Sequence, residues 1–448
     1  MNRTKELCEF LAGLDPEMVD PENMLDIRYK TLDWLGCIIA AQGHSCVAGL
    51  RATITAAGGN PQASGAGMPE KTSAQQAAFY NGFASHALEY DDTNKIAITH
   101  PGGPVIAAAL AAAEARGATF QSYAMGVAAG YEAMIRLGGA INPDHYQHWH
   151  TTGTCGVFAA AAAVCKIMGL DARQMETAFG LASTMASGLI YVFGTDAKLV
   201  TVGNAARNGL LAAELAAGGL SAPEDAFAAP GGYARSAGGK EDLSFMVPRA
   251  GDRLLLEDAY YKIHASCGHT HSALDALQAL MAGRSFGPED VASVEAQVYR
   301  TALQLCGGYR TETESKAKFS LPYCIAVMLL YGRCTLSEFT PEIRCSDAVA
   351  QYARRITVKE NEAYTAAYPA LRMEKITVVL RDGSALERTV DLPLGRPPYQ
   401  FLEEKFFSLA ELTVTPACAQ NIRDSVFAIR DDEPLLNIGN QIRNLRRN

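Results

Sequence analysis

The sequence lacks paired cysteine motifs, long runs of like charge and a recognisable export signal. Its 11 cysteines are an odd number, scattered from Cys8 to Cys418 without a CxxC pair, in a chain too long to need disulfide cross-links. No block of five or more like charges occurs and the net charge is −9, which argues against non-specific binding to nucleic acid or to anionic membranes. The opening MNRTKELCEF has neither the apolar core nor the cleavage site of a secretion signal. We therefore expect a cytoplasmic protein with no nucleic-acid or membrane partner.

A membrane-spanning segment is not predicted either. The longest uncharged stretch, residues 177–195, is long enough to cross a bilayer. It contains threonines, serines and several glycines, which are more typical of a buried helical segment.

The spacing of apolar residues changes along the chain. The 448 residues are enough for two or three domains, and a hydrophobic content of 48% is enough for a large core. Through about the first 260 residues the apolar spacing is helical, which predicts an all-α region. Residues 263–392 are expected to be α+β, and helical spacing returns after a linker at 394–398. The expected strands lie at 292–300, 355–361 and 374–392, the last with a hairpin turn at 381–384. The expected fold class is therefore mainly α.

Three alanine-rich segments mark the first region: 104–116, 156–168 and 204–217. A glycine follows each one and is a candidate helix C-terminus, and a capping residue for the next helix follows each glycine. These residues are Gly117 with Thr119, Gly169 with Asp171, and Gly219 with Ser221. The pattern repeats about every 50 residues and predicts tightly packed helical hairpins.

A histidine or lysine precedes each of these predicted helices. His100, His150 and Lys198 are separated by 50 and 48 residues. If the three hairpins pack in parallel, these side chains meet at one end of the bundle. Helix N-termini carry unpaired N–H groups and the positive end of the helix dipole, and both favour carboxylates. The pattern therefore predicts a binding site for a small polycarboxylate.

Eight of the nine histidines fall in three polar segments, and imidazole can give or take a proton near neutral pH. They are His86 and His100, then His145, His148 and His150, then His264, His269 and His271. Lys262, at the start of the last segment, is a second candidate cation. The alternative is zinc binding, either by the second group or by the third group with Cys267, but neither has HExxH or paired CxxC spacing. We predict no metal.

Several motifs, in this order along nearly the whole chain, resemble the MmgE/PrpD family. They are Tyr90-Asp91-Asp92-Thr93 leading to Thr99-His100-Pro101, the run WHTTGT at 149–154, Lys198 ahead of Gly203-Asn204-Ala205-Ala206, Cys267 with Thr270-His271 and Asp275, Phe319-Ser320-Leu321-Pro322-Tyr323, and Leu394-Gly395-Arg396-Pro397. The family includes 2-methylcitrate dehydratase, cis-aconitate decarboxylase and iminodisuccinate epimerase. The resemblance implies a discontinuous helical domain at 1–262 and 393–448, an α+β lid at 263–392, an active site between them, a homodimer, and chemistry without a cofactor.

The resemblance also implies the site residues. The catalytic candidates are Asp92, His100, His150, Lys198 and Lys262, and the substrate-binding candidates are Glu89, Asp91, Thr93, Thr151, Thr152, Thr201, His271 and Tyr323. In the family's reactions a proton leaves or reaches the carbon next to a carboxylate. We expect the two lysines to hold substrate carboxylates and to stabilise the developing charge. His100 is expected to transfer the proton with help from His150, and Asp92 to fix an imidazole tautomer or a substrate hydroxyl.

The chain departs from the family pattern at three places. Glu89 stands where the family usually has aspartate. Asn94 and Lys95 follow the Asp-Asp-Thr motif where many relatives have a histidine, and Thr201 also replaces a histidine. We expect one of the histidines of the 264–271 segment to substitute for them.

The predicted function is a cofactor-independent lyase acting on a small di- or tricarboxylate. A 2-methylcitrate dehydratase-like activity is the first expectation, and cis-aconitate decarboxylase-like or iminodisuccinate epimerase-like activity is the alternative. Hypotheses of another class are a zinc-dependent hydrolase, which metal analysis would identify, and a non-catalytic carboxylate-binding protein, which would bind without turnover.

Overall fold

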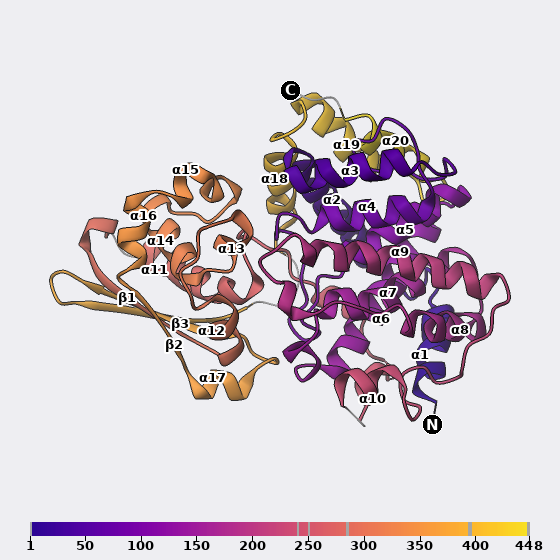
Figure 1. Ribbon diagram of the computed structural model, residues 1–448, viewed down its shortest axis with the longest axis horizontal. Coiled ribbons are helices and arrows are strands. Elements are labelled where there is room, and N and C mark those ends of the chain that lie inside the picture. Colours follow the sequence, from indigo (N-terminus) through magenta and orange to yellow (C-terminus); the bar gives the residue numbers. More distant parts are fainter. Residues whose placement is uncertain (1, 240–241, 250, 284–285, 393–396, 446–448) are drawn as a thin grey trace. The chain divides into compact units, whose positions relative to one another are not determined.

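The chain folds into two units that are mainly helical. The computed structural model describes residues 2–239, 242–249, 251–283, 286–392 and 397–445 (Figure 1). Described residues of 1–87, 91–261 and 395–448 form a helical unit, and those of 88–90 and 262–394 form an α+β unit. The mainly α fold class is confirmed. The expected linker and the motif that starts at Leu394 lie largely outside the described residues.

The helical unit contains thirteen α-helices within its described residues. They are α1 (Arg3–Gly13), α2 (Pro21–Ala40), α3 (Ser45–Ala57), α4 (Ala74–Ser85), α5 (Gly102–Arg116), α6 (Phe120–Ile141), α7 (Thr151–Ile167), α8 (Ala172–Ser183), α9 (Ala197–Ala217), α10 (Tyr233–Gly238), α18 (Tyr399–Ala410), α19 (Pro416–Ala428) and α20 (Leu436–Arg443). The last three return to the amino-terminal part of the unit, where α18 packs against α2.

Small residues let the central helices α5, α6, α7 and α9 approach closely. α7 packs against the other three, and α4 packs against α5 and α9. A Cβ atom at Gly209 of α9 would lie 2.5 Å from the Cβ of Ala160 on α7. Because real Cβ atoms do not approach so closely, this position requires glycine at this helix spacing. The predicted tight helical core is confirmed.

Most of the predicted caps are present. Gly117 ends α5 in the left-handed conformation, Thr119 caps α6, and Asp171 forms a capping box with Gln174 at the start of α8. The prediction for Ser221 was wrong, because no helix begins there.

Two helices begin a turn or more earlier than predicted. α7 begins at Thr151 rather than at Gly156, and α9 begins at Ala197 rather than at Asn204. The added turns contain threonine and valine, which have modest helix propensity, and packing in the core overrides that preference. Lys198 therefore lies in the first turn of α9, not ahead of it.

Residues 177–195 are only partly a buried helix. α8 ends at Ser183, and the side chain of Tyr191 beyond it is 87% exposed, so the second half of that prediction was wrong. Among the described residues, no helix has the length and apolar character needed to cross a membrane.

The α+β unit is built on one four-stranded sheet. Its elements are α11 (His271–Gly283), β1 (Val291–Val298), α12 (Arg300–Cys306), α13 (Glu314–Lys318), α14 (Leu321–Tyr331), α15 (Pro341–Arg344), α16 (Asp347–Ala353), β2 (Ile356–Glu360), α17 (Glu362–Ala367), β3 (Met373–Leu380) and β4 (Ala385–Asp391). The strand order is β2-β1-β3-β4, with β1 and β2 parallel and the other pairs antiparallel. The predicted strands and the β3-β4 hairpin are confirmed. The buried residues alternate along most of β3 and along β1 from Val294 onward, and α11 packs on β3 and β4.

Candidate active site

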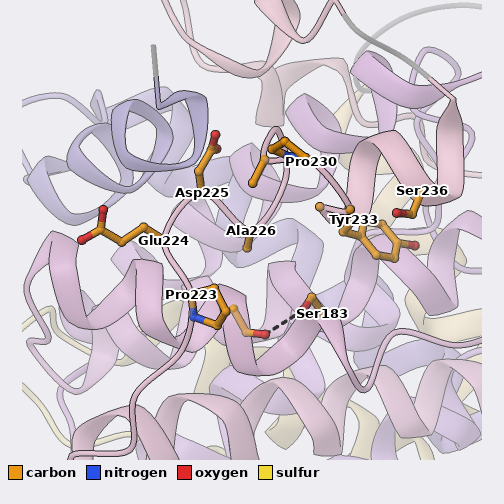
Figure 2. A pocket seen from close by; sticks show the side chains of 12 residues that line it. Ser183, Pro223, Glu224, Asp225, Ala226, Pro230, Tyr233 and Ser236 are labelled. Carbon is orange, nitrogen blue, oxygen red and sulfur yellow. Dashed lines mark hydrogen bonds between the residues drawn. The ribbon is translucent and has the colours of Figure 1, made fainter.

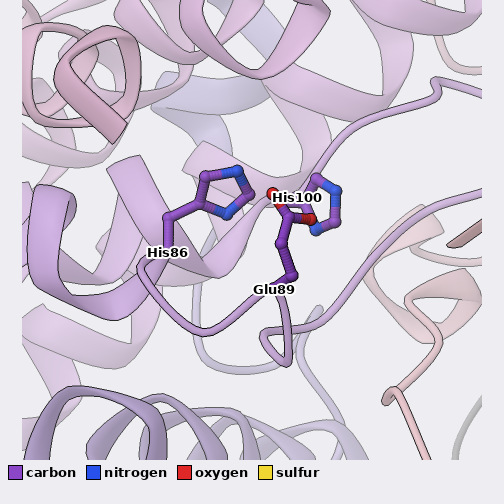
Figure 3. Close-up of side chains that lie close together, drawn as sticks. All are labelled: His86, Glu89 and His100. Carbon is purple, nitrogen blue, oxygen red and sulfur yellow. The ribbon is translucent and has the colours of Figure 1, made fainter. Parts of the chain in front are cut away.

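Three imidazoles of the helical unit lie together where three helices end or begin. His86 follows α4, His100 precedes α5, and His150 is the residue before α7. The ring centroid of His86 lies 4.8 Å from that of His100 and 5.7 Å from that of His150. Figure 3 shows the side chains of His86 and His100. We call the three rings the imidazole cluster.

Each ring of the imidazole cluster is held through its Nδ1 atom. The Nδ1 of His86 lies 2.7 Å from a carboxylate oxygen of Asp91. The Nδ1 of His100 lies 2.9 Å from the backbone oxygen of Asp92, and that of His150 lies 2.7 Å from the hydroxyl of Thr201. A carbonyl oxygen can only accept, so Nδ1 of His100 carries a proton, and in the neutral ring the lone pair is on Nε2. Such a nitrogen can accept a proton from a substrate.

Asp91 and Asp92 are neighbours in the chain but have different contacts. The carboxylate of Asp91 holds His86 and lies 3.6 Å from the Nδ1 of His100. The carboxylate of Asp92 accepts hydrogen bonds from the hydroxyl of Tyr131 at 2.7 Å and from the backbone N–H of Gly102 at 2.9 Å. Asp92 thus contacts an imidazole through its backbone carbonyl rather than its carboxylate, and its expected contact with a substrate hydroxyl stays a prediction. Asp91 is the carboxylate that fixes a ring.

Asp92 is fully buried, and its charge is poorly solvated. The pKa of Asp92 is raised to about 7, chiefly by burial, and the nearby Asp91 carboxylate acts in the same direction. Lys30 and the hydrogen bonds from Tyr131 and Gly102 act in the opposite direction. The carboxyl group is therefore partly protonated at neutral pH.

The structure brings together the segments around His100, His150 and Lys198. The hydroxyl of Thr152 accepts a hydrogen bond from the backbone N–H of His100 at 3.1 Å. Lys198 is only 3% exposed, and its ammonium lies 5.0 Å from the ring centroid of Phe193, a ring whose centroid is 5.0 Å from that of His150. Positive charge and two helix N-termini thus lie beside the imidazole cluster.

Other predicted polar residues shape the loop before α5. Thr93 pairs with Tyr260 through backbone hydrogen bonds, and its hydroxyl donates to the backbone oxygen of Thr99 at 3.0 Å. The side chain of Asn94 accepts from the N–H of Ala97 at 2.9 Å. Ile98 has a φ of 53°, which β-branched residues rarely adopt. This loop is held in one conformation, and it presents His100.

Asn142 holds the start of α7 in a similar way. Its side-chain amide lies within 3.5 Å of the Thr151 hydroxyl, and both residues are buried. Thr151 therefore has a structural contact of its own.

The predicted residues of the α+β unit are also buried and bonded within that unit. The Lys262 ammonium donates to the backbone oxygen of Glu89 at 2.8 Å and lies 3.5 Å from its carboxylate. His271 lies 3.4 Å through Nε2 from the backbone oxygen of Ser266, and its ring centroid is 5.1 Å from that of His264. The Tyr323 hydroxyl donates to the backbone oxygen of Glu338.

Neither proposed zinc cluster assembles within the described parts of the chain. Neither His145 with His148 and His150, nor the histidines of 264–271 with Cys267, brings three ligand atoms close enough for one ion. His145 instead uses both ring nitrogens, with the backbone oxygen of Ala237 and with the hydroxyl of Thr154.

Two residues of the site were not predicted from the sequence. His86 was recognised as part of a polar segment but not as a site residue, although its position five residues before Asp91 was a usable signal. Tyr131 lies within the apolar helix α6, and nothing in the local sequence indicates that its hydroxyl contacts Asp92.

The helical unit also contains a cavity of about 310 Å³ that residues of the imidazole cluster do not line (Figure 2). It lies among the end of α8, the loop 223–232 and α10. Ser183 at its edge donates to the backbone oxygen of Gly180. The described contacts therefore place the imidazoles and this cavity in separate parts of the unit.

Comparison with known proteins covers nearly the whole chain. The sequence model of the MmgE/PrpD N-terminal domain matches residues 5–246, and that of the MmgE/PrpD C-terminal domain matches residues 264–429. A cis-aconitate decarboxylase of Aspergillus terreus is 28% identical, over 98% of this chain and 96% of its own length. The human cis-aconitate decarboxylase is 27% identical over 74% of this chain and 71% of its own length. A 2-methylcitrate dehydratase of Cupriavidus necator is 29% identical over 28% of each chain.

Proposed function

The chain belongs to the MmgE/PrpD family, as its motifs predicted, and on this basis we propose that it is a cofactor-independent lyase acting on a small di- or tricarboxylate. Its relatives are decarboxylases and dehydratases, and the chain is an enzyme of this lyase type. The observation that carries the proposal is the imidazole cluster, in which the Nδ1 atom of each ring is held by the helical unit itself.

The proposed chemistry is a proton transfer at the carbon next to a carboxylate. In a decarboxylation, the bond to a departing carboxylate breaks, its electron pair moves to the adjacent carbon system, and a proton is added there. In a dehydration, a proton leaves such a carbon and a hydroxyl group leaves the neighbouring carbon as water. Both reactions need a group that moves a proton near neutral pH, and imidazole is suited to this.

We assign the proton transfer principally to Nε2 of His100, with His150 assisting. Lys198 and the N-termini of α5 and α7 provide positive charge for substrate carboxylates and for the charge that develops during the reaction. Lys262 is assigned a similar role from the α+β unit. As part of the same proposal, the α+β unit serves as a lid domain and the protein is a cytoplasmic homodimer.

The first reaction to test is decarboxylation of a cis-aconitate-like tricarboxylate. Relatives that match almost the full length of this chain have that name, whereas the dehydratase match covers little more than a quarter of it. Dehydration of a 2-methylcitrate-like substrate is the second candidate, since the two reactions make the same demand on the proton-transfer group.

Proton NMR in D₂O tests these candidates together. Chelator-treated protein would be incubated with cis-aconitate, 2-methylcitrate, citrate and smaller dicarboxylates. We expect one of them to lose carbon dioxide or water, or to exchange a carbon-bound proton for deuterium. No reaction with any substrate, or activity that appears only after Zn²⁺ is added, would contradict the proposal.

A further inference from the structure

Thr201 lies in α9, and its hydroxyl has two close partners. The oxygen lies 2.7 Å from the backbone oxygen of Lys198 and 2.7 Å from the Nδ1 of His150. A threonine hydroxyl has one proton, and a backbone oxygen can only accept. The hydroxyl therefore donates to Lys198, and its oxygen accepts a hydrogen bond from His150.

These two hydrogen bonds decide which ring nitrogen of His150 carries the proton. Because the Thr201 oxygen accepts a hydrogen bond from Nδ1 of His150, Nδ1 carries the proton. In the neutral ring the lone pair is then on Nε2, the nitrogen farther from the backbone. His150 is thereby set as a proton acceptor through Nε2.

The packing around Thr201 holds the pair in this geometry. His150 is 2% exposed and Thr201 is 9% exposed. The backbone N–H of His150 donates to the oxygen of Gly188 at 2.9 Å. A Cβ atom at Gly153 would lie 2.9 Å from the Cβ of Thr201, and one at Gly188 would lie 3.3 Å from it. Glycine at positions 153 and 188 therefore leaves the room that the Thr201 side chain occupies beside His150.

The three rings of the imidazole cluster are held by different chemical groups. A carboxylate holds His86, a backbone carbonyl holds His100, and a neutral hydroxyl holds His150. We propose that Thr201 is a positioning residue that fixes the Nδ1–H tautomer of His150 and so makes its Nε2 the proton acceptor. This inference rests on the proposed lyase function and assigns Thr201 a role other than direct substrate binding.

Paired substitutions of Thr201 test the role in catalysis. Thr201→Val keeps the shape of the side chain but removes the hydroxyl, and Thr201→Ser keeps the hydroxyl. We expect kcat to fall about 10²-fold in Thr201→Val with little change in KM, the lower end of the contribution of a proton-transfer group. Thr201→Ser should remain within about threefold of the wild type. Equal losses in both variants, or a change confined to KM, would overturn the proposal.

A matched control shows whether removing a threonine hydroxyl from any helix is enough to lower kcat. Thr53 on α3 is exposed, and its hydroxyl donates to the backbone oxygen of Gly49. Thr53→Val should leave kcat unchanged. Circular dichroism and thermal unfolding of each variant would show whether it is folded.

A second measurement is independent of turnover. Long-range ¹H–¹⁵N NMR of protein labelled at histidine distinguishes the two neutral tautomers, and His150→Gln identifies the His150 signals. We expect a protonated Nδ1 for His150 in the wild-type protein and in Thr201→Ser. A protonated Nε2 in the wild-type protein would overturn the proposal even if Thr201→Val did not fold. If no polycarboxylate is turned over but the Nδ1–H tautomer is found, the proposed function fails while the Thr201–His150 contact stands.

Discussion

Each unit contains an aspartate bonded to a histidine, but the two pairs use opposite nitrogens of the ring. In the helical unit, Nδ1 of His86 lies 2.7 Å from Asp91. In the α+β unit, Nε2 of His264 lies 2.9 Å from Asp275. Nε2 lies at the end of the ring away from the backbone. In the His86–Asp91 pair this nitrogen points away from the aspartate, whereas in the His264–Asp275 pair it contacts the aspartate of its own unit. The same two residue types thus bond through different ring nitrogens in the two units.

A neighbouring imidazole in each unit shows the same difference in the ring nitrogen that is bonded. Asp91 lies near a second imidazole, that of His100, which is held through Nδ1 by a backbone carbonyl. His271, beside His264, is again contacted through Nε2. The comparison predicts that proton transfer at His100 depends on the imidazole cluster, which includes the His86–Asp91 pair, and that the α+β pair contributes mainly stability.

The largest expected effect is at His100. His100→Ala should lower kcat by roughly 10²–10⁴-fold, because it removes the principal proton-transfer group. His264→Ala should lower kcat by less than about tenfold. Steady-state kinetics on the substrate identified by NMR measures both. His148→Ala, on an exposed ring, is the control. Near-normal turnover of His100→Ala would remove the assignment.

The two aspartates provide the next test. Asp91→Asn should lower kcat by about 10²-fold, because an amide cannot stabilise a charged imidazole and can hold the wrong tautomer. Asp275→Asn should change kcat by no more than about threefold. The kinetics of the two variants should be measured beside their thermal unfolding. Equal losses of kcat in both variants would remove the distinction between the two pairs.

Two buried tyrosines test stability in each unit. Tyr131→Phe removes a hydrogen bond to the buried carboxyl group of Asp92 and should cost about 1 to 3 kcal/mol of unfolding free energy. Tyr323→Phe removes a bond to the backbone oxygen of Glu338 and should cost about 1 kcal/mol. Urea unfolding followed by circular dichroism measures both. A large rise in KM for Tyr323→Phe would instead support its expected role in substrate binding.

The smallest expected effect on kcat concerns a buried histidine outside the imidazole cluster. Burial lowers the pKa of His145 to about 4, and the hydrogen bond to Ala237 only partly offsets this. Between about pH 6.5 and pH 4 the unfolded chain gains a proton that the folded chain does not. Stability from this group is therefore present above pH 6.5 and is lost as the pH falls toward 4, by about 3 kcal/mol.

His145→Gln should lack that loss while its kcat stays close to that of the wild type. Thermal unfolding of both proteins from pH 7.5 to pH 4.5 measures the difference. Parallel stability curves would show that His145 does not titrate in this way, and a large loss of kcat would show that burial alone does not separate structural from catalytic imidazoles.

Local patterns predicted much of the fold and the general place of the site. The alanine-rich helices, the β3-β4 hairpin and most caps follow from side-chain spacing and turn chemistry, which act over a few residues. The early start of α7 and α9 did not follow, because core packing overrides the weak helix propensity of threonine and valine. His86 and Tyr131 were missed because their contacts depend on which way neighbouring chain segments face.

The sequence by itself determined the family, the mainly α fold class and the recurrence of His100, His150 and Lys198 at the start of successive helices. Only the tertiary structure decided that Asp91 holds an imidazole through its carboxylate and Asp92 through its backbone carbonyl, and that Thr201 contacts His150. Adjacent side chains can point in different directions, and residues 51 positions apart meet only through helix packing. The spacing of residues sets which groups are available, whereas the folded backbone sets which atom of each ring is bonded.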